Sequence, residues 1–406
     1  MSPDSRGSQG PVEIRRLREE PSVLRIGIDA RPILRLRTGV ERMLWHFVEN
    51  LQEHGLGQEY VLFLDGEPGK DFASRCPHRI VVEPVRYLRL QRFIDVWILR
   101  QVGELIEHHG IDLFFSPHTK FPQSGVPRFT TVHGVEWHYC PSDFALLERM
   151  KQWGWFRLAV RHSAGIVSFA ENTRTDIRKM SPGLHAPVCV SHEGVDPMFR
   201  RLDRAEKSRG VLDRLGIDRP FILSVCRLDP RKNLDALLRA FAISVRERDV
   251  PHVLVLAGKP GRKAEELRAL SGRLGLANRV RFTGFLGDED IVQLYNQADL
   301  FAYPSKYEGF GLPLLEAMAC GVPVLTSRGS ALAEVAGDAA ILVDPYSDPD
   351  IATGILRGLL DESLRSRLVD AGLDRVARFS WEKMTARICE FMITEYLRDG
   401  RERTTG

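Results

Sequence analysis

The sequence predicts an α/β protein made of two Rossmann-like domains that face each other across a cleft. Short apolar runs recur along the 406 residues with helical segments or long loops between them, and this alternation stops once near the middle of the chain and then starts again. The runs are apolar throughout, which a parallel sheet covered on both faces requires. The chain is also too long for one ordinary core, so two domains are expected.

Changes in composition give the boundaries of the predicted units. The first residues are polar and charged, with no apolar run of the kind found in a secretory signal, so we expect a loosely held tail. A charge-rich stretch without a strand, from Asp196 to Arg219, connects the two arrays, and a terminal helix is expected from Trp381 to about Leu397. The predicted units are residues 1–22, 23–200, 201–380 and 381–406.

The first array begins with a strand over Val23–Ala30, a loop rich in Arg, Pro and Gly, and a helical pattern over Glu41–Leu51. The loop lies at the carboxyl end of its strand, where sheets of this kind bind ligands. It lacks the G-x-G-x-x-G fingerprint, which disfavours an NAD-dependent oxidoreductase. Further strands, most of them ending in polar residues, are expected at Tyr60–Leu64, Arg79–Val82, Ile111–Phe115, Phe129–Val132, Gly165–Phe169 and Val188–Val190.

The second array restarts with a strand over Phe221–Cys226, which opens into the loop RLDPRKN. A helix follows, because apolar residues recur at helical spacing from Leu234 to Val245. Further strands are expected at His252–Ala257, Val280–Phe282, Asp299–Ala302 and Val322–Thr326.

The stretch Ser305–Ser327, SKYEGFGLPLLEAMACGVPVLTS, is the most informative part of the chain. Its glycines allow a loop to approach a ligand closely. Pro313 and Gly321 are typical of the first turn and the end of a helix, which we expect over Leu312–Cys320. The start of this helix directs partial positive charge and free N–H groups at the loop, and phosphate is the ligand that suits such a site best.

Two carboxylates belong to the same stretch: Glu308 lies in the loop, and Glu316 follows eight positions later in the helix. Carboxylates placed that way accept hydrogen bonds from hydroxyl pairs at both ends of one elongated, phosphate-bearing molecule. A nucleotide sugar is such a molecule. The alternative is a tight turn with a capped helix, in which both acids are only solvated.

This pattern, with Gly309-Phe310-Gly311 between the two glutamates and Gly321-Val322-Pro323-Val324 after them, resembles the signature of the retaining glycosyltransferases of the family 4 type, which have the GT-B fold. The resemblance runs from about Leu24 to Leu397. It implies that the terminal helix crosses back onto the first domain. It also implies same-face attack on a nucleotide-diphosphate sugar, assisted by the leaving phosphate, so the glutamates are not the acid and nucleophile of a glycosidase.

The resemblance assigns roles in the second domain. Arg227 and Lys232 match the cations that clasp the donor diphosphate, on which negative charge develops. Taken alone, two such charges are better explained as surface residues; their position at the carboxyl end of a strand is what favours a role in the site. Glu308 corresponds to the carboxylate beside the sugar hydroxyls and Glu316 to the one that binds the ribose. The backbone amides expected near sugar and phosphate oxygens are those around Gly309, Phe310, Gly311 and Leu312.

In the first domain, His133 aligns with the histidine that reaches the sugar in the resembled family. The usual next residue is an acid, whereas this chain has Gly134, a departure that bears on the role of the histidine. Gly39 corresponds to the loop glycine whose amide approaches the phosphate. The alternatives are a structural histidine at a strand end and an ordinary turn glycine.

Metal-using glycosyltransferases hold a divalent ion with Asp-x-Asp, and two such triplets occur, Asp288-Glu289-Asp290 and Asp348-Pro349-Asp350. Each precedes a helical pattern, so we interpret both as helix caps. We therefore expect no metal site and no cofactor, with the nucleotide sugar as co-substrate.

Composition narrows the class of partner. A formal net charge of +3, with 43% hydrophobic and 27% charged residues, is that of a globular protein without a general affinity for nucleic acid. No apolar run has the roughly 20 residues that a membrane span needs. The six scattered cysteines are interpreted as buried thiols in a reducing compartment, which predicts a cytoplasmic location.

Two basic clusters leave an alternative open. The first surrounds Thr38-Gly39, and the second interleaves with apolar residues between Leu88 and Leu99. The plain interpretation is a solvated helix face beside a core face. The other is a surface that associates with an anionic membrane, as an enzyme extending a lipid-linked glycan requires. The clusters are Arg31, Arg35, Arg37 and Arg42, and Arg86, Arg89, Arg92 and Arg100.

The sequence thus predicts a glycosyltransferase that moves a hexosyl group to a glycan or lipid-linked acceptor. GDP-mannose is the first expectation for the donor, from overall likeness to bacterial mannosyltransferases, and UDP-sugars are the second. A nucleotide-sugar 2-epimerase with the same two-domain frame is the alternative enzyme. A non-catalytic binder of nucleotide sugars is disfavoured by the full set of Arg227, Lys232, Glu308 and Glu316.

Overall fold

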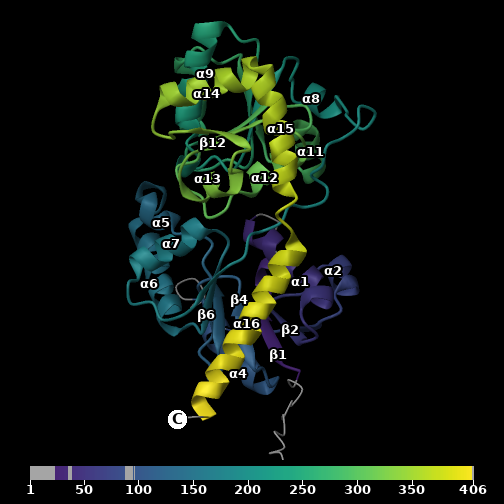
Figure 1. Cartoon of the computed structure of the whole chain (residues 1–406), viewed down its shortest axis with the longest axis vertical. Coiled ribbons are helices and arrows are strands. Elements are labelled where there is room, and N and C mark those ends of the chain that lie inside the picture. Colours follow the sequence, from purple (N-terminus) through teal and green to yellow (C-terminus); the bar gives the residue numbers. More distant parts are fainter. Residues whose placement is uncertain (1–22, 35–38, 87–94, 96, 405–406) are drawn as a thin grey trace, which may run out of the picture.

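The computed structural model describes residues 23–34, 39–86, 95 and 97–404. It has two halves, stacked one above the other in Figure 1, and each is built around a parallel sheet. The predicted tail lies outside the described residues, as do Arg35, Arg37, Arg89 and Arg92 of the basic clusters and the apolar residues Leu88, Leu90, Phe93 and Ile94.

The first sheet has seven parallel strands in the order β3-β2-β1-β4-β5-β6-β7. The order reverses between β1 and β4, so the carboxyl ends of these two strands open a crevice of the kind that binds ligands. All seven predicted strands are confirmed, with bounds that differ by a few residues. They are β1 (Arg25–Asp29), β2 (Glu59–Leu64), β3 (Arg79–Val82), β4 (Leu113–Ser116), β5 (Arg128–Thr131), β6 (Gly165–Ser168) and β7 (Val188–Val190).

Helices connect these strands and cover the sheet. The longest are α1 and α6, and the predicted helix over Glu41–Leu51 is confirmed within α1. The helical segments are η1 (Arg31–Leu34), α1 (Gly39–His54), α2 (Lys70–Arg75), η2 (Trp97–Gln101), α4 (Val102–His108), α5 (Glu136–Tyr139), η3 (Pro141–Asp143), α6 (Leu146–His162) and α7 (Glu171–Met180).

The second sheet has six parallel strands in the order β10-β9-β8-β11-β12-β13, and here the order reverses between β8 and β11. The last strand was missed by the sequence analysis, because four apolar residues between two helices fit a buried helix segment equally well. The strands are β8 (Phe221–Val225), β9 (Val253–Ala257), β10 (Val280–Gly284), β11 (Leu300–Tyr303), β12 (Val324–Ser327) and β13 (Ala340–Val343).

The connection between the two sheets carries no strand, as predicted, and only the short helix α8 (Gly210–Arg214). The helices that follow are η4 (Pro230–Lys232), α9 (Leu234–Arg248), α10 (Ala264–Arg273), α11 (Asp288–Tyr295), α12 (Leu312–Ala319), α13 (Ser330–Ala336), α14 (Asp348–Leu360), α15 (Glu362–Val376) and α16 (Trp381–Thr404).

The terminal helix α16 leaves the second half and lies along the first, as Figure 1 shows in yellow. Its residues pack against strands of the first sheet. The Tyr60 hydroxyl donates to Cys389 Sγ at 3.3 Å, and the rings of Phe129 and Phe391 meet edge to face with centroids 5.7 Å apart. The crossing implied by the family resemblance is therefore confirmed.

In the second basic cluster the neighbouring side chains of Trp97 and Ile98 pack into the core, whereas Arg86 and Arg100 are exposed. Trp97 and Ile98 are fully buried, and Arg86 is ion-paired with Glu83 and Glu104. In the first cluster Arg31 and Arg42 are also buried and ion-paired, so they are not a solvated helix face.

Two other sequence expectations concern the thiols and membrane spans. The cysteines are unpaired, but Cys76 and Cys226 are only half-buried, which corrects the expectation that all six are buried. Within the described residues, no helix combines the length and apolar character needed to cross a membrane.

The docking of α16 can be tested at Gly165, where an added Cβ would lie 2.6 Å from Phe391 Cζ. Overpacking of this kind costs about 1–3 kcal/mol, so Gly165→Ala should lower the free energy of unfolding by that amount in denaturant titrations. Gly183→Ala is the control, because nothing lies within 4 Å of its added Cβ. Phe391→Leu in the Gly165→Ala background should recover part of the loss. Equal effects of the two glycine variants would contradict this packing.

Candidate active site

A cleft of about 730 Å³ lies between the two halves, at the carboxyl ends of both sheets. It contains the switch point of each sheet, which is why loops distant in sequence meet there. Every residue proposed for the site from sequence lines this cleft: Gly39, His133, Arg227, Lys232, Glu308, Gly309, Phe310, Gly311, Leu312 and Glu316.

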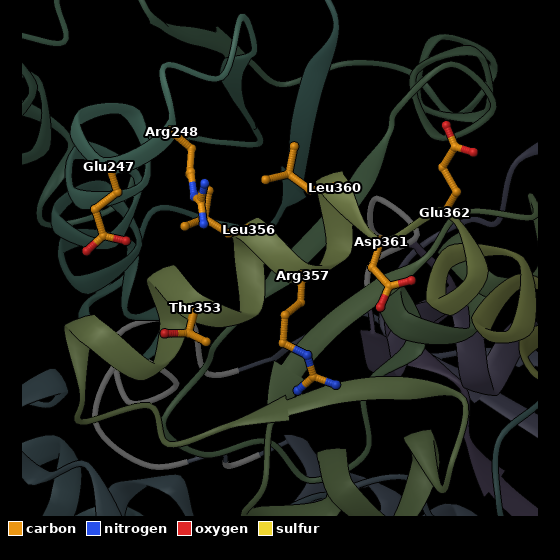
Figure 2. A pocket seen from close by; sticks show the side chains of 8 residues that line it. All are labelled: Glu247, Arg248, Thr353, Leu356, Arg357, Leu360, Asp361 and Glu362. Atoms are coloured by element: carbon orange, nitrogen blue, oxygen red, sulfur yellow. The ribbon is translucent and has the colours of Figure 1, made fainter.

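Figure 2 shows a second hollow, of about 700 Å³, on the outer side of the second half. Its side chains come from α9, α14 and the start of α15, far from the strand ends. Acids and arginines alternate around it, so it has no preference for one sign of charge. It is lined by Glu247, Arg248, Thr353, Leu356, Arg357, Leu360, Asp361 and Glu362.

Glu308 is the centre of the cleft wall in the second half. Arg231 Nη1 and Lys232 Nζ each donate to its Oε1 at 2.7 Å, and the Ser305 hydroxyl donates to the same oxygen at 2.6 Å. The Tyr303 hydroxyl is 3.2 Å from it. Lys232 comes from the loop after β8, and Glu308 from the loop after the neighbouring strand β11, so the switch point brings them together. Within the described part of the chain, no group donates to Oε2.

Charge keeps this carboxylate ionised. Burial acts to raise the pKa of Glu308, but Arg231 and Lys232 outweigh it and hold the pKa at about 2. Burial and the neighbouring Arg231 lower the pKa of Lys232, while Glu308 raises it. Glu308 is therefore a hydrogen-bond acceptor at neutral pH and has no proton to give.

Arg227 takes a different place from Lys232. Its side chain is 63% exposed at the rim of the cleft, and its only ion pair among the described residues is with Asp229 at 3.5 Å. It does not contact Glu308. Its guanidinium remains available to an anionic ligand.

Gly309 fits directly against the first half. A Cβ at this position would lie 1.6 Å from the carbonyl oxygen of His133, so only glycine allows the two loops to approach this closely. The Thr173 hydroxyl donates to the Gly309 carbonyl at 3.3 Å, and the Tyr307 hydroxyl lies 2.8 Å from Asp176 Oδ2. The glycine predicted to contact the donor therefore also sets the distance between the two walls.

His133 is held as a neutral ring. Its Nε2–H donates to the Pro117 carbonyl at 2.8 Å, and burial lowers its pKa to about 4. The remaining ring nitrogen, Nδ1, is then an acceptor. The imidazole can accept a hydrogen bond from a hydroxyl, but it cannot supply positive charge to a phosphate.

Glu316 is linked to the first half through Arg42. Arg42 Nη1 donates to its Oε1 at 2.9 Å, and the Tyr295 hydroxyl donates to its Oε2 at 3.0 Å. Burial raises the pKa of Glu316, and Arg42 offsets part of that rise. Arg42 also binds Asp288 at 3.0 Å, so one arginine joins α1 to both α11 and α12. A carboxylate accepts about four hydrogen bonds, so Glu316 keeps acceptor capacity toward the cleft.

The start of α12 completes the site. Gly311 has φ of 129°, in a region that favours glycine, and Leu312 and Pro313 form the first turn of the helix as predicted. This end of the helix lies on the cleft beside Glu308. The positive end of the helix dipole therefore lies at the cleft, where it stabilises an anion.

Two family models match almost the whole of both halves. Residues 37–199 match the model described as Glycosyltransferase Family 4, and residues 213–375 match the one described as Glycosyl transferases group 1. The O-antigen chain mannosyltransferase B of Escherichia coli is 40% identical over 319 residues, which cover 77% of this chain and 80% of that protein. The chain belongs to the family 4 glycosyltransferases.

Other similar proteins agree with this family. The MMP alpha-(1->4)-mannosyltransferase of Mycolicibacterium hassiacum is 40% identical over 276 residues, 64% of each chain. Among solved structures, Anabaena HepE in complex with UDP and glucose superposes with a TM-score of 0.69 at 20% identity, over 92% of this chain and all of that one. WaaG, a glycosyltransferase of lipopolysaccharide biosynthesis, superposes with a TM-score of 0.67 at 17% identity, over 91% of this chain and 99% of that one. The fold of this glycosyltransferase is thus GT-B.

The interpretation of the Asp-x-Asp triplets as helix caps needs correction. The residue that precedes α11 is Gly287, and Ser347 caps α14 by accepting from the Asp350 amide at 3.2 Å. The acids instead occupy the first helical turns, where the helix dipole favours negative charge, and pair with arginines. The pairs are Asp288 with Arg42, Asp290 with Arg214, Asp348 with Arg239, and Asp350 with Arg328.

Two cleft residues were missed in the sequence analysis. Arg231 precedes Lys232 in a loop already recognised, but nothing in RLDPRKN showed which of its arginines contacts Glu308.

 In the fold Arg231 contacts Glu308, whereas Arg227 lies at the rim of the cleft.

Glu193 is the other missed residue. It follows β7, one of the expected strands that end in polar residues, but nothing in the sequence separated it from its neighbours. Its side chain lines the cleft and is 4% exposed, and within the described part of the chain no group donates to it. Burial raises the pKa of Glu193 to about 8, so the carboxyl group carries a proton at pH 7 and can donate a hydrogen bond into the cleft.

A neutral Glu193 makes the stability of this glycosyltransferase depend on pH. The unfolded chain loses this proton near its ordinary pKa, whereas the folded chain keeps it up to about pH 8. The contribution of Glu193 to the free energy of unfolding is complete below the pKa that this group has in the unfolded chain. It disappears as the pH rises through its pKa in the folded chain. Glu193→Gln removes this dependence.

We therefore expect Glu193→Gln to gain stability over the unmodified chain between pH 5 and pH 8, by at most a few kcal/mol. Denaturant unfolding at intervals of pH measures the difference. Glu266→Gln, at an exposed position of α10, is the control and should show no such gain. If the difference in the free energy of unfolding between Glu193→Gln and the unmodified chain does not change with pH, Glu193 is not a buried neutral carboxyl group.

Proposed function

We propose that this glycosyltransferase moves a mannosyl group from GDP-mannose to a hydroxyl of a glycan or lipid-linked acceptor, with retention of the anomeric configuration. In this proposal the domain of residues 201–380 binds the donor, and the domain of residues 23–200 binds the acceptor. UDP-sugars are the second choice of donor. The relatives named as mannosyltransferases support mannose as the sugar.

The arrangement of Glu308 is the observation that supports transfer most directly. Its Oε1 is held by Arg231, Lys232 and Ser305, and its Oε2 is left to accept from a ligand. An ionised carboxylate fixed in this way binds sugar hydroxyls near the anomeric centre. Because it stays ionised and hydrogen-bonded, it suits orientation of the donor and not protonation of a leaving group.

The leaving diphosphate is the group that needs stabilisation during transfer. Lys232 Nζ donates to Glu308 and to the Tyr303 hydroxyl, so one of its three protons remains for a phosphate oxygen. Arg227 supplies a second cation from the rim, and the N-terminal end of α12 supplies free amides. These groups together carry the charge that a metal ion carries in other glycosyltransferases.

Retention follows if the acceptor attacks the face from which the diphosphate leaves. The leaving phosphate oxygen then takes the acceptor proton, and the acceptor oxygen forms its bond to the anomeric carbon as the sugar–phosphate bond breaks. His133, neutral and with Nδ1 as an acceptor, orients a sugar hydroxyl. The 2-epimerase alternative is not favoured, because the family matches and the named relatives are those of transferases.

Removal of either charge at the centre of the cleft should abolish most transfer. Glu308→Gln and Lys232→Ala are each expected to reduce kcat/KM by at least about a hundred-fold, a loss of roughly 3 kcal/mol in transition-state binding. Glu206→Gln is the surface control. Circular dichroism and thermal unfolding show whether each variant is folded. Near wild-type turnover in both folded variants would refute the proposed site.

Transfer from GDP-mannose should continue in excess EDTA, because cationic side chains and helix amides face the diphosphate. We expect mannosyl transfer from GDP-mannose to exceed glucosyl transfer from UDP-glucose, both measured as release of nucleotide diphosphate in the presence of acceptor. Release without acceptor is the control for hydrolysis. A loss of activity in EDTA that Mg²⁺ or Mn²⁺ restores would contradict the metal-independent chemistry, and preference for UDP-glucose would contradict the donor.

A further inference from the structure

Helix α6 exposes an unusual amount of apolar surface. Twelve large apolar side chains are exposed among the described residues, and five of them belong to this one helix. Figure 1 places α6 at the outer edge of the first half, away from α16. The exposed fractions are 70% for Leu146, 65% for Leu147, 61% for Met150, 48% for Trp153 and 44% for Leu158.

The core does not require these side chains. The inner face of α6 is already anchored by Phe156 and Ala159, which are buried, and the Phe156 ring lies 5.8 Å from the ring of Trp137. A surface helix that packs by one face normally carries polar residues on the other. The outward residues of α6 are therefore apolar for a reason other than folding.

The same helix is basic. Four cations and one acid give it a formal charge of +3, which equals the net charge of the whole 406-residue chain. Within the described part of the chain, none of the four cations is ion-paired, whereas Arg86 in the predicted basic cluster is paired with two acids. Arg157 lies over the Trp153 ring at 4.6 Å. The four are Arg149, Lys151, Arg157 and Arg161.

The position of α6 connects it to the cleft. It begins three residues after Asp143, whose Oδ2 accepts from the Arg231 amide at 2.6 Å, and Arg231 binds Glu308. The most exposed side chains, Leu146 and Leu147, are at this end of the helix. A surface that α6 contacts is therefore close to the cleft.

We infer that α6 is a docking surface for an anionic lipid bilayer. Leu146, Leu147, Met150 and Trp153 enter the boundary between headgroups and acyl chains, while Lys151, Arg157 and Arg161 bind the anionic headgroups. Unpaired cations interspersed with Leu, Met and Trp suit such a surface. Trp, Met and Arg also occur at protein interfaces, but a second copy of this chain would bring the same positive charges against each other, whereas an anionic bilayer neutralises them. This inference goes beyond the proposed transfer reaction.

The first experiment is co-sedimentation of the full chain with vesicles. The protein should pellet with vesicles of mixed phosphatidylcholine and phosphatidylglycerol, less so at high salt, and remain in the supernatant with phosphatidylcholine alone. Binding does not require activity, so a failure here is distinct from a failure of the proposed reaction. A protein that stays in the supernatant with anionic vesicles at low salt would overturn the inference.

Substitutions assign binding to the helix. Leu147→Ser with Met150→Ser should lower the partition coefficient on anionic vesicles by at least about ten-fold. Tyr346→Ser with Leu360→Ser removes exposed apolar side chains from the second half and should leave the coefficient unchanged. Equal binding by the α6 variant and the unmodified chain would refute the role of α6. Sedimentation velocity identifies the other occupant: a dimer of the unmodified chain that the α6 variant loses, without vesicle binding, makes this face an interface between copies.

Charge reversal separates α6 from the basic cluster predicted from sequence. Lys151→Glu with Arg157→Glu should lower anionic binding by at least about ten-fold, because each contributes to attraction near the surface. Arg86→Glu with Arg100→Glu changes the net charge by the same amount and should lower it much less. If Arg86→Glu with Arg100→Glu lowers binding more than the α6 pair does, the membrane-binding surface lies at that cluster, and the inference for α6 is overturned.

Discussion

The charge balance around Glu308 is the interaction on which the rest of the site depends. A buried carboxylate is unfavourable unless cations and hydrogen bonds compensate for its lost hydration. Arg231 and Lys232 provide the cations, and both lie on one short loop after β8. Each cation also depends on the carboxylate, since removal of one partner leaves the other charge buried. The position of Glu308 therefore fixes the loops after β8 and β11 relative to each other.

The two domains are held by polar contacts at the edges of the cleft and by one close approach at its centre. Arg42 reaches from α1 to Glu316 and Asp288, and Glu334 accepts from the amides of Glu171 and Asn172 at the start of α7. Between them, the loop at Gly309 lies against the His133 carbonyl. Because these contacts are mostly polar and include few apolar side chains, they are of the kind that domain motions break and remake.

Much of the fold followed from the sequence, because a parallel sheet covered on both faces leaves continuous apolar runs. The prediction failed at β13, where four residues were too few to separate a strand from a helix. In the site, Glu308 could be placed on the cleft because it lies in a glycine-containing loop before a helix, and Lys232 because the family resemblance assigned it. Arg231 and Glu193 could not be found, because Arg231 depends on its contact with Glu308, far away in sequence, and Glu193 on burial. The capping assignment of Asp288 failed for the same reason, since Arg42 is 246 positions away.

The docking surface that we infer for α6 has to act together with the cleft. An acceptor held at a membrane has to meet a donor that is dissolved in water. The enzyme therefore has to hold the two substrates close together in a fixed relative orientation. The segment from Glu136 to Leu146 spans that distance in this chain: Glu136 lines the cleft, Asp143 binds the Arg231 amide, and Leu146 is the first exposed residue of α6. A bilayer bound at α6 would therefore lie at a fixed distance from Glu308, set by folded segments and not by a flexible linker.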